Sequence, residues 1–217
     1  GGAGGIGSAV CRLLPTLGVL PIIGFNTNVD QANALSEEIG GFAIQIDLGN
    51  SDSIIAAIDS ISQVLGDQDT LVGAVLAASP PPDIEPFSSL NSVHFTKQFE
   101  INVIGPQLLL SRLIKKFFRK NRSGTIVGIS SQAVGDENKR PATGMGAYVI
   151  AKAALNSLLS VCAAEYTWLK VARVSPGFTK TAMLEVFDPR YLEMIQGQQD
   201  FSSPEEVAKL IINEFKI

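Results

Sequence analysis

Short apolar runs alternate along this chain with longer stretches in which apolar residues recur every three or four positions. The run 71–78 is almost wholly apolar, as a strand buried on both faces should be. In 51–65 the apolar residues Ile54, Ile58 and Ile61 have the spacing of one helix face. The pattern therefore predicts strands and helices in regular alternation.

This alternation predicts the fold class. The expected strands are 20–25, 42–46, 71–78, 125–129 and 169–174, and the expected helices are 8–14, 30–39, 51–65, 95–120, 148–166 and 203–215. Strands that alternate with helices form a parallel sheet with helices on both faces, which is a doubly wound, three-layer α/β/α fold. Because the chain has no internal repeat and no linker-like change in composition, we expect residues 1–217 to form a single domain.

Composition narrows the class of protein. With 46% hydrophobic and 18% charged residues, the 217-residue chain can bury a sizeable core. The net charge of −4 is spread without blocks, so we expect neither nucleic acid nor a membrane as partner. The cysteines, Cys11 and Cys162, have neither metal-ligand spacing nor the pattern of a disulfide framework. We therefore expect a cytoplasmic protein without a metal site.

The first seven residues, GGAGGIG, form a glycine-rich motif. Its glycines fit two spacings, G-x-G-x-x-G at positions 2, 4 and 7 and G-x-x-x-G-x-G at positions 1, 5 and 7. Either spacing lets backbone amides approach a pyrophosphate at a helix N-terminus. The motif is diagnostic only after a strand, and that strand would lie before Gly1. The alternative is a plain glycine-rich tail.

The residues after the second expected strand bear on the choice of dinucleotide. In a dinucleotide-binding unit an acidic residue there favours NAD. Here the stretch is Phe25, Asn26, Thr27 and Asn28, with neither an acid nor an arginine. Amide and hydroxyl donors tolerate a 2′-phosphate, so the stretch favours NADP and leaves NAD possible. The alternative is an ordinary polar turn.

Tyr148 and Lys152 are two polar residues in the apolar stretch 144–155. Four residues are about one helical turn, so the phenol and the ammonium share one face. Acid–base chemistry near pH 7 needs the tyrosine pKa lowered by about 3 units, or about 4 kcal/mol. A neighbouring ammonium and a cationic cofactor ring would each lower it. The alternative is a snorkelling lysine beside a tyrosine packed by its ring.

Six motifs together carry a family resemblance. They are GGAGGIG at 1–7, Asp47–Leu48, Asn102 in INVIG, ISS at 129–131, Tyr148-x-x-x-Lys152, and PGFTKTAM at 176–183. With these motifs, in this order, the chain resembles the short-chain dehydrogenase/reductase family over nearly its whole length. The resemblance implies a Rossmann-type fold. It also implies an oxidoreductase that transfers a hydride between NAD(P)H and a carbonyl or alcohol substrate.

The resemblance implies four catalytic residues. Tyr148 would be the proton donor or acceptor at the substrate oxygen, and Lys152 would lower its pKa and bond the nicotinamide ribose. Ser131, preferred here to Ser130, would orient the substrate carbonyl. Asn102 would hold a water that links Lys152 to solvent through a helix irregularity.

The resemblance also implies a cofactor site made of backbone and short side chains at strand ends. The residues expected there, besides Tyr148 and Lys152, are Gly1, Gly5, Ile6 and Gly7 at the pyrophosphate, Asn26 and Thr27 near the adenosine ribose, Asp47 and Leu48 at the adenine, Ala77 and Ala78 at the adenosine ribose through their backbone, and Pro176, Gly177, Thr179 and Thr181 at the nicotinamide carboxamide and the phosphates. For the two threonines the alternative is simple hydrogen bonding within the loop.

Three departures from the family pattern stand out. The family shows N-N-A-G after its fourth strand, where this chain has the residues 76–79, LAAS. The segment between Ser131 and Tyr148 is longer than usual and charged at 136–140, so it would shape the substrate mouth or form a solvated surface loop. The first and last strands of the family are not visible, so residues are expected to be missing at both ends.

The remaining expectations concern partners and alternatives. The partner would be a small carbonyl or alcohol substrate, and helices 102–120 and 148–166 would pair subunits in a homodimer or homotetramer. In the family the region 184–201 is a mobile substrate lid, and its apolar residues here would suit an apolar substrate; the alternative is a simple packed helix. The resemblance leaves 3-oxoacyl thioesters, sugars, steroids and xenobiotics open as substrates. The alternative function is a non-catalytic NAD(P)-binding sensor on the same fold. A nucleotide-sugar epimerase would need a larger C-terminal domain.

Overall fold

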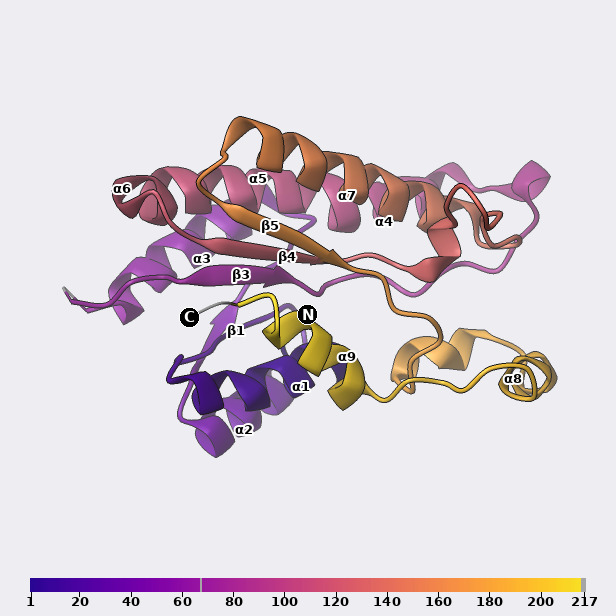
Figure 1. The fold of residues 1–217 in the computed structure, drawn as a ribbon, viewed down its shortest axis with the longest axis horizontal. Helices are drawn as coiled ribbons and strands as arrows, with labels where there is room; N and C mark the ends of the chain where they lie inside the picture. The colour runs from indigo at the N-terminus through magenta and orange to yellow at the C-terminus, as the bar shows by residue number, and fades with distance from the viewer. Residues whose placement is uncertain (67, 216–217) are drawn as a thin grey trace.

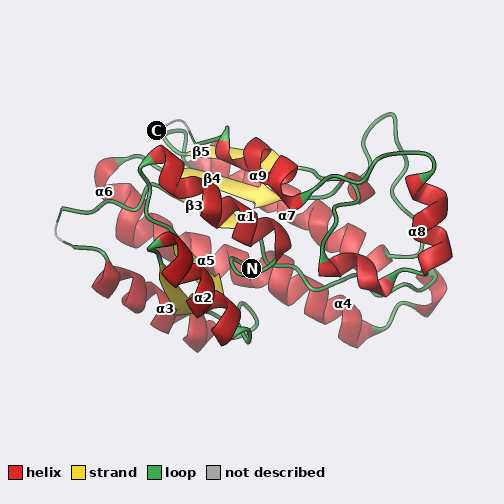
Figure 2. Ribbon diagram, turned by 90° about the horizontal axis from the view of Figure 1, so that it is seen from below, coloured by secondary structure: helices red, strands yellow, loops and turns green. Residues whose placement is uncertain are grey.

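The computed structural model describes residues 1–66 and 68–215, and it confirms an α/β fold made of parallel strands and helices (Figures 1 and 2). The strands are β1 (Ile22–Phe25), β2 (Phe42–Gln45), β3 (Gly73–Leu76), β4 (Thr125–Ile129) and β5 (Lys170–Val174). The α-helices are α1 (Gly5–Leu13), α2 (Val29–Ile39), α3 (Ser51–Val64), α4 (Ser92–Phe99), α5 (Gly105–Leu113), α6 (Arg119–Asn121), α7 (Gly146–Glu165), α8 (Pro189–Gln196) and α9 (Pro204–Ile212). Short 3₁₀ segments cover Leu14–Leu17, Phe87–Ser89, Gln132–Val134 and Ala182–Val186, and π-helical turns cover Glu100–Ile104 and Ile114–Phe118.

The strands β3, β4 and β5 form the middle of three layers (Figure 1). On one face lie α3, α5 and α7, and the core there is built from residues such as Leu113, Phe118, Ile126 and Leu159. On the other face α1 and α9 pack against each other and against the sheet. Because both faces are covered, the strands are rich in apolar residues throughout.

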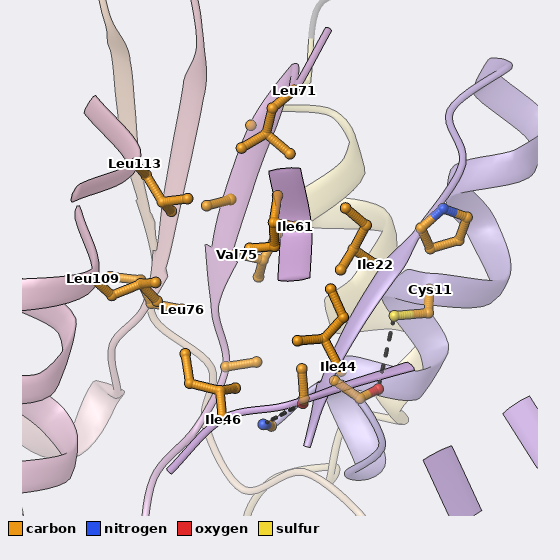
Figure 3. A pocket seen from close by; sticks show the side chains of 18 of the residues that line it. Cys11, Ile22, Ile44, Ile46, Ile61, Leu71, Val75, Leu76, Leu109 and Leu113 are labelled. Carbon is orange, nitrogen blue, oxygen red and sulfur yellow. Dashed lines mark hydrogen bonds between the residues drawn. The ribbon is translucent and has the colours of Figure 1, made fainter. Parts of the chain in front are cut away.

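Among the described residues the parallel strands form two sheets. The order is β1-β2 in one sheet and β3-β4-β5 in the other, with every pairing parallel. Between β1 and β3 lies a cavity of about 510 Å³, which Figure 3 shows with Ile22, Ile44 and Ile46 on one side and Leu71 and Val75 on the other. The facing edges of β1 and β3 are not paired with each other, and the helices pack against both sheets.

Several element boundaries differ from the predicted ones for local reasons. β1 begins at Ile22, one residue after Pro21, whose nitrogen has no hydrogen to donate to a strand ladder. β3 ends at Leu76, just before a loop that contains three consecutive prolines. The predicted helix 95–120 lies within a longer helical stretch, which starts at Ser92 and contains two π-helical turns.

α7 is the central helix of the fold. Its length and apolar composition alone would allow it to cross a membrane. In the structure it is a core helix, with Leu155 and Leu159 buried against the sheet. A Cβ atom on Gly128 of β4 would lie 2.3 Å from Leu159 Cδ1, so a glycine is needed for α7 to pack this closely.

Candidate active site

Tyr148 and Lys152 lie one turn apart on α7, and both side chains are buried. Tyr148 is 8% exposed and Lys152 is 2% exposed. The Lys152 Nζ atom lies 5.7 Å from the centroid of the Tyr148 ring, so the two side chains share one face of the helix. A snorkelling lysine would keep its ammonium in water, which this arrangement rules out.

Lys152 is held at the end of β4. Its Nζ donates a hydrogen bond of 2.9 Å to the carbonyl oxygen of Ile129, the last residue of that strand. Burial lowers the pKa of Lys152 to about 7, because the charged ammonium loses its hydration. The amine therefore takes up and releases a proton near neutral pH. An ammonium has three hydrogens to donate, so it can also bond a ligand hydroxyl.

The pKa of Tyr148 moves in the opposite direction from the predicted one. Burial raises the pKa of Tyr148, and a hydrogen bond with Ser131 counteracts only part of that increase. The predicted lowering by Lys152 requires a permanent positive charge, whereas the buried amine is partly neutral near pH 7. In this structure the phenol therefore keeps its proton at neutral pH.

The structure places Ser131, and not Ser130, against Tyr148. Ser131 lies close enough to the Tyr148 hydroxyl to lower its pKa, and its Oγ accepts a hydrogen bond of 3.1 Å from the backbone N–H of Ala133. Ser130 belongs to the extension of the sheet, where its N–H donates to the Val174 carbonyl at 2.8 Å. Its side chain is buried and has no hydrogen-bond partner among the described residues.

Asn102 lies in the π-helical turn Glu100–Ile104 and is 1% exposed. Its Nδ2 donates to both the backbone oxygen and the side-chain Oε1 of Gln98, each at 3.0 Å. Gly105 follows the turn, and a Cβ atom there would lie 2.2 Å from the Leu48 carbonyl oxygen. The glycine therefore lets the Asn102 turn approach the Asp47–Leu48 segment. Sequence reasoning did not single out Gln98, because no motif includes it.

The glycine-rich turn contacts two other strand ends. The N–H of Gly2 donates to the carbonyl of Gly24 in β1 at 2.8 Å. A Cβ atom on Gly1 would lie 2.4 Å from the Ala78 nitrogen, and one on Gly5 would lie 2.5 Å from Thr181 Cγ2. The turn is thus packed between β1, the end of β3 and the loop after β5, at a distance that only glycine allows.

Most of the other predicted cofactor residues fall into two groups. Gly1, Gly7, Asn26, Asp47, Leu48, Ala77 and Ala78 line the cavity between the sheets, together with the predicted catalytic residue Asn102. The loop after β5 carries the second group, which is Pro176, Gly177, Thr179 and Thr181. Ile6 is half-buried in α1, and Thr27 is exposed just before α2. Thr179 Oγ1 donates a hydrogen bond of 3.2 Å to the Gly177 carbonyl. This is the hydrogen bonding within the loop that the sequence allows as the alternative to cofactor binding.

The residues of the glycine-rich turn and the strand ends beside it fit a dinucleotide. α1 begins at Gly5 with no acidic residue in its first turn, and the first amides of a helix have no partner within it. These amides and the positive end of the helix dipole attract a phosphate. The positions where Cβ atoms would fill the turn are all glycines, so a pyrophosphate can approach the backbone. The glycine turn contacts β1 and the end of β3, and Ser131 and the Lys152 amine lie at the carboxyl end of β4.

Comparison with known proteins identifies the family. The model of the short chain dehydrogenase family matches residues 1–191. A cis-4-hydroxycyclohexanecarboxylate dehydrogenase of Sinomonas cyclohexanicum is 28% identical over 221 residues, which cover 97% of this chain and 85% of that protein. A 2,3-dihydro-2,3-dihydroxybenzoate dehydrogenase of Bacillus subtilis (strain 168) is 30% identical over 190 residues, covering 84% of this chain and 69% of the relative.

A solved structure shows the same fold. It is a 3-ketoacyl-(acyl-carrier-protein) reductase from Brucella melitensis complexed with NADH, with a TM-score of 0.85 at 20% identity, and the match covers 98% of this chain and 86% of that one. The fold and the site thus define an NAD(P)-dependent oxidoreductase of alcohol and carbonyl groups. The chain belongs to the short-chain dehydrogenase/reductase family.

Replacing Gly7 with alanine is expected to weaken NAD(P)H binding by more than about tenfold and to destabilise the fold by about 1–3 kcal/mol. The new Cβ would lie 2.0 Å from the Gly1 carbonyl oxygen, so the turn would have to open. Titration of NAD(P)H by its fluorescence would measure the affinity. Gly4→Ala is the matched control, because its Cβ would lie 3.3 Å from the same oxygen. Equal losses in the two variants would contradict this account of the turn.

Proposed function

We propose that the protein is an NADP(H)-dependent reductase of apolar ketones or aldehydes, with Tyr148 as the acid. The observation that carries the proposal is the buried Tyr148 beside the half-buried Ser131, with the buried Lys152 amine one turn away on the same helix. Carbonyl reduction needs a proton donor, and a tyrosine phenol carries its proton at neutral pH.

Each polar residue has a task in this reaction. When bound, a reduced nicotinamide supplies the hydride. The Ser131 hydroxyl donates a hydrogen bond to the substrate carbonyl oxygen and so stabilises negative charge that develops there. The Tyr148 O–H bond then breaks, and its proton completes the alcohol. The phenolate regains a proton through Lys152, whose pKa of about 7 lets it exchange protons near neutral pH, and a water held by Asn102 would link Lys152 to solvent.

The surroundings of Tyr148 support an apolar substrate. Met145, Tyr148 and Val149 form a buried apolar cluster. Phe187, which precedes α8, packs against that cluster, and its ring lies 5.6 Å from the ring of Phe178 in an edge-on contact. An apolar lining of this kind favours an apolar carbonyl compound over a charged one. Residues 136–140 are exposed, and Asp136 Oδ1 accepts hydrogen bonds from the backbone N–H groups of Asn138 and Lys139. This local turn supports the interpretation of the segment as a solvated surface loop.

The segment between β1 and α2 supports the choice of NADP(H). Asn26 and Thr27 are exposed there, and the Asn26 carbonyl oxygen accepts a hydrogen bond of 3.0 Å from Gln45 Nε2. A carboxylate at this point would repel a 2′-phosphate, and the first acid is Asp30 within α2. Amide and hydroxyl groups can instead donate hydrogen bonds to the phosphate oxygens.

NADPH is expected to raise the melting temperature by about 5–10 °C at 100 times its dissociation constant, because that occupancy adds about 2.7 kcal/mol of stability. NADH at the same concentration should raise it less. Turnover of a panel of apolar ketones and aldehydes, followed by nicotinamide absorbance, would test the chemistry. Equal shifts would contradict the NADP(H) preference. Binding of either dinucleotide without turnover of any carbonyl would favour the non-catalytic sensor instead.

A further inference from the structure

Gln98 is a buried polar residue near the end of α4, only 1% exposed, and no motif of the sequence includes it. Its side chain makes two hydrogen bonds. Nε2 donates to the carbonyl oxygen of Pro81 at 2.8 Å, and Oε1 accepts from Asn102 Nδ2 at 3.0 Å. The side chain therefore connects the loop that follows β3 with the asparagine of the π-helical turn.

The chemistry of these partners fixes the direction of both amides. The Pro81 carbonyl can only accept, so the NH₂ group of Gln98 must face it. The Gln98 oxygen then faces Asn102, and only the NH₂ group of Asn102 can donate to it. A second acceptor, the Gln98 backbone oxygen, receives the other hydrogen of the same NH₂ group at 3.0 Å. Reversing either amide would place two oxygens or two NH₂ groups face to face.

This arrangement leaves the Asn102 Oδ1 atom as an acceptor. The atom is buried and has no hydrogen-bond partner among the described residues. The π-helical turn packs against α7, the helix that carries Lys152. An amide held in this direction presents an oxygen to a proton-carrying group, whereas the reversed amide would present two more donors beside an amine that also donates.

We propose that Gln98 is a positioning residue for the reaction, which holds the Asn102 amide so that its oxygen can accept a hydrogen bond from a water that carries protons to and from Lys152. The inference rests on the proposed reductase function. Its anchor is Pro81, in the proline loop that follows Ala77 and Ala78 at the end of β3. Gln98 thus links the proline loop, which follows the predicted cofactor residues Ala77 and Ala78, to Asn102, which is expected to act with Lys152 in proton transfer. It acts through Asn102 and does not touch the substrate.

The test compares Gln98→Met with Gln98→Glu. Methionine fills the space but keeps neither hydrogen bond, so kcat is expected to fall about tenfold and the pH profile of kcat to shift. A protonated glutamic acid can donate to Pro81 and accept from Asn102, so Gln98→Glu should recover part of kcat at low pH and lose it as the carboxyl ionises. If Gln98→Met does not fold, this new pH dependence of Gln98→Glu decides alone. A Gln98→Glu profile with the wild-type shape from pH 5 to 9 would overturn the proposal.

A double-mutant cycle separates positioning from a general structural role. In the Asn102→Ala background, Gln98→Met should lower kcat no further, because its target is gone. Full additivity of the two losses would overturn the proposal. Hydrogen exchange of the Asn102 side-chain amide, measured by NMR, gives a readout that does not depend on turnover. Exchange should be slow in the wild-type protein and faster in Gln98→Met. Unchanged exchange would refute the positioning role, whereas slow exchange in a protein without reductase activity would refute only the proposed function.

Discussion

Tyr148→Phe is expected to lower kcat by about a thousandfold or more while the affinity for NADPH changes by less than about threefold. The substitution removes one oxygen atom from a side chain that is 8% exposed, so the packing of the ring survives. What it removes is the proton donor beside Ser131. Steady-state kinetics with the best carbonyl of the panel and fluorescence titration of NADPH would measure the two quantities.

Tyr166→Phe is the matched control for this experiment. Tyr166 follows the last residue of α7, and its ring packs edge-on against Trp168 at 5.7 Å. The same chemical change there should leave kcat and NADPH affinity close to the wild-type values. If Tyr148→Phe kept more than about a tenth of the wild-type kcat, Tyr148 could not be the acid, and the proposed reaction would lose its proton donor.

Lys152→Met is expected to stabilise the fold by up to about 5 kcal/mol below pH 7 while abolishing most of the activity. The pKa of Lys152 is about 7 in the folded chain against an ordinary value of 10.5, and each unit corresponds to about 1.4 kcal/mol. Between these two values the unfolded chain binds more protons than the folded chain. The stability of the wild-type protein therefore rises with pH through this window, and the cost of the buried lysine is fully present below pH 7.

Urea unfolding at several pH values between 6 and 10.5 would measure this effect. The stability difference between the variant and the wild type should be largest at pH 6 and shrink as the pH approaches 10.5. The gain will be reduced by about 1 kcal/mol, because the Ile129 carbonyl loses its donor. Lys116→Met is the control, since the Lys116 side chain is 40% exposed and pairs with Asp59 on the surface. A variant less stable than the wild type at pH 6 would show that the buried amine does not carry this cost.

The elements and the central pair were predictable because their signals are local. Apolar runs bounded by turn residues gave β4 its correct limits, 125–129. A spacing of four on a helix is enough to put Tyr148 and Lys152 on one face. The family resemblance, read from six motifs, is confirmed by the match over residues 1–191.

Properties that depend on tertiary packing could not be predicted from the sequence. The pKa of Tyr148 was predicted in the wrong direction because proximity to a lysine is visible in sequence and depth of burial is not. Gln98 was missed for a similar reason, since its partner Pro81 is 17 residues away and the contact forms only after folding.

The π-helical turns also change how the segment from Ser92 to Asn121 should be read in an alignment. Such a turn accommodates one residue more than an α-helical turn, and one residue corresponds to a rotation of about 100° around the axis. Side chains before Glu100 and after Ile104 therefore follow two different phases. In a relative that lacks this bulge, a gap of one position within 100–104 would restore the correspondence of the buried positions, and an ungapped comparison would pair inward residues of one protein with outward residues of the other.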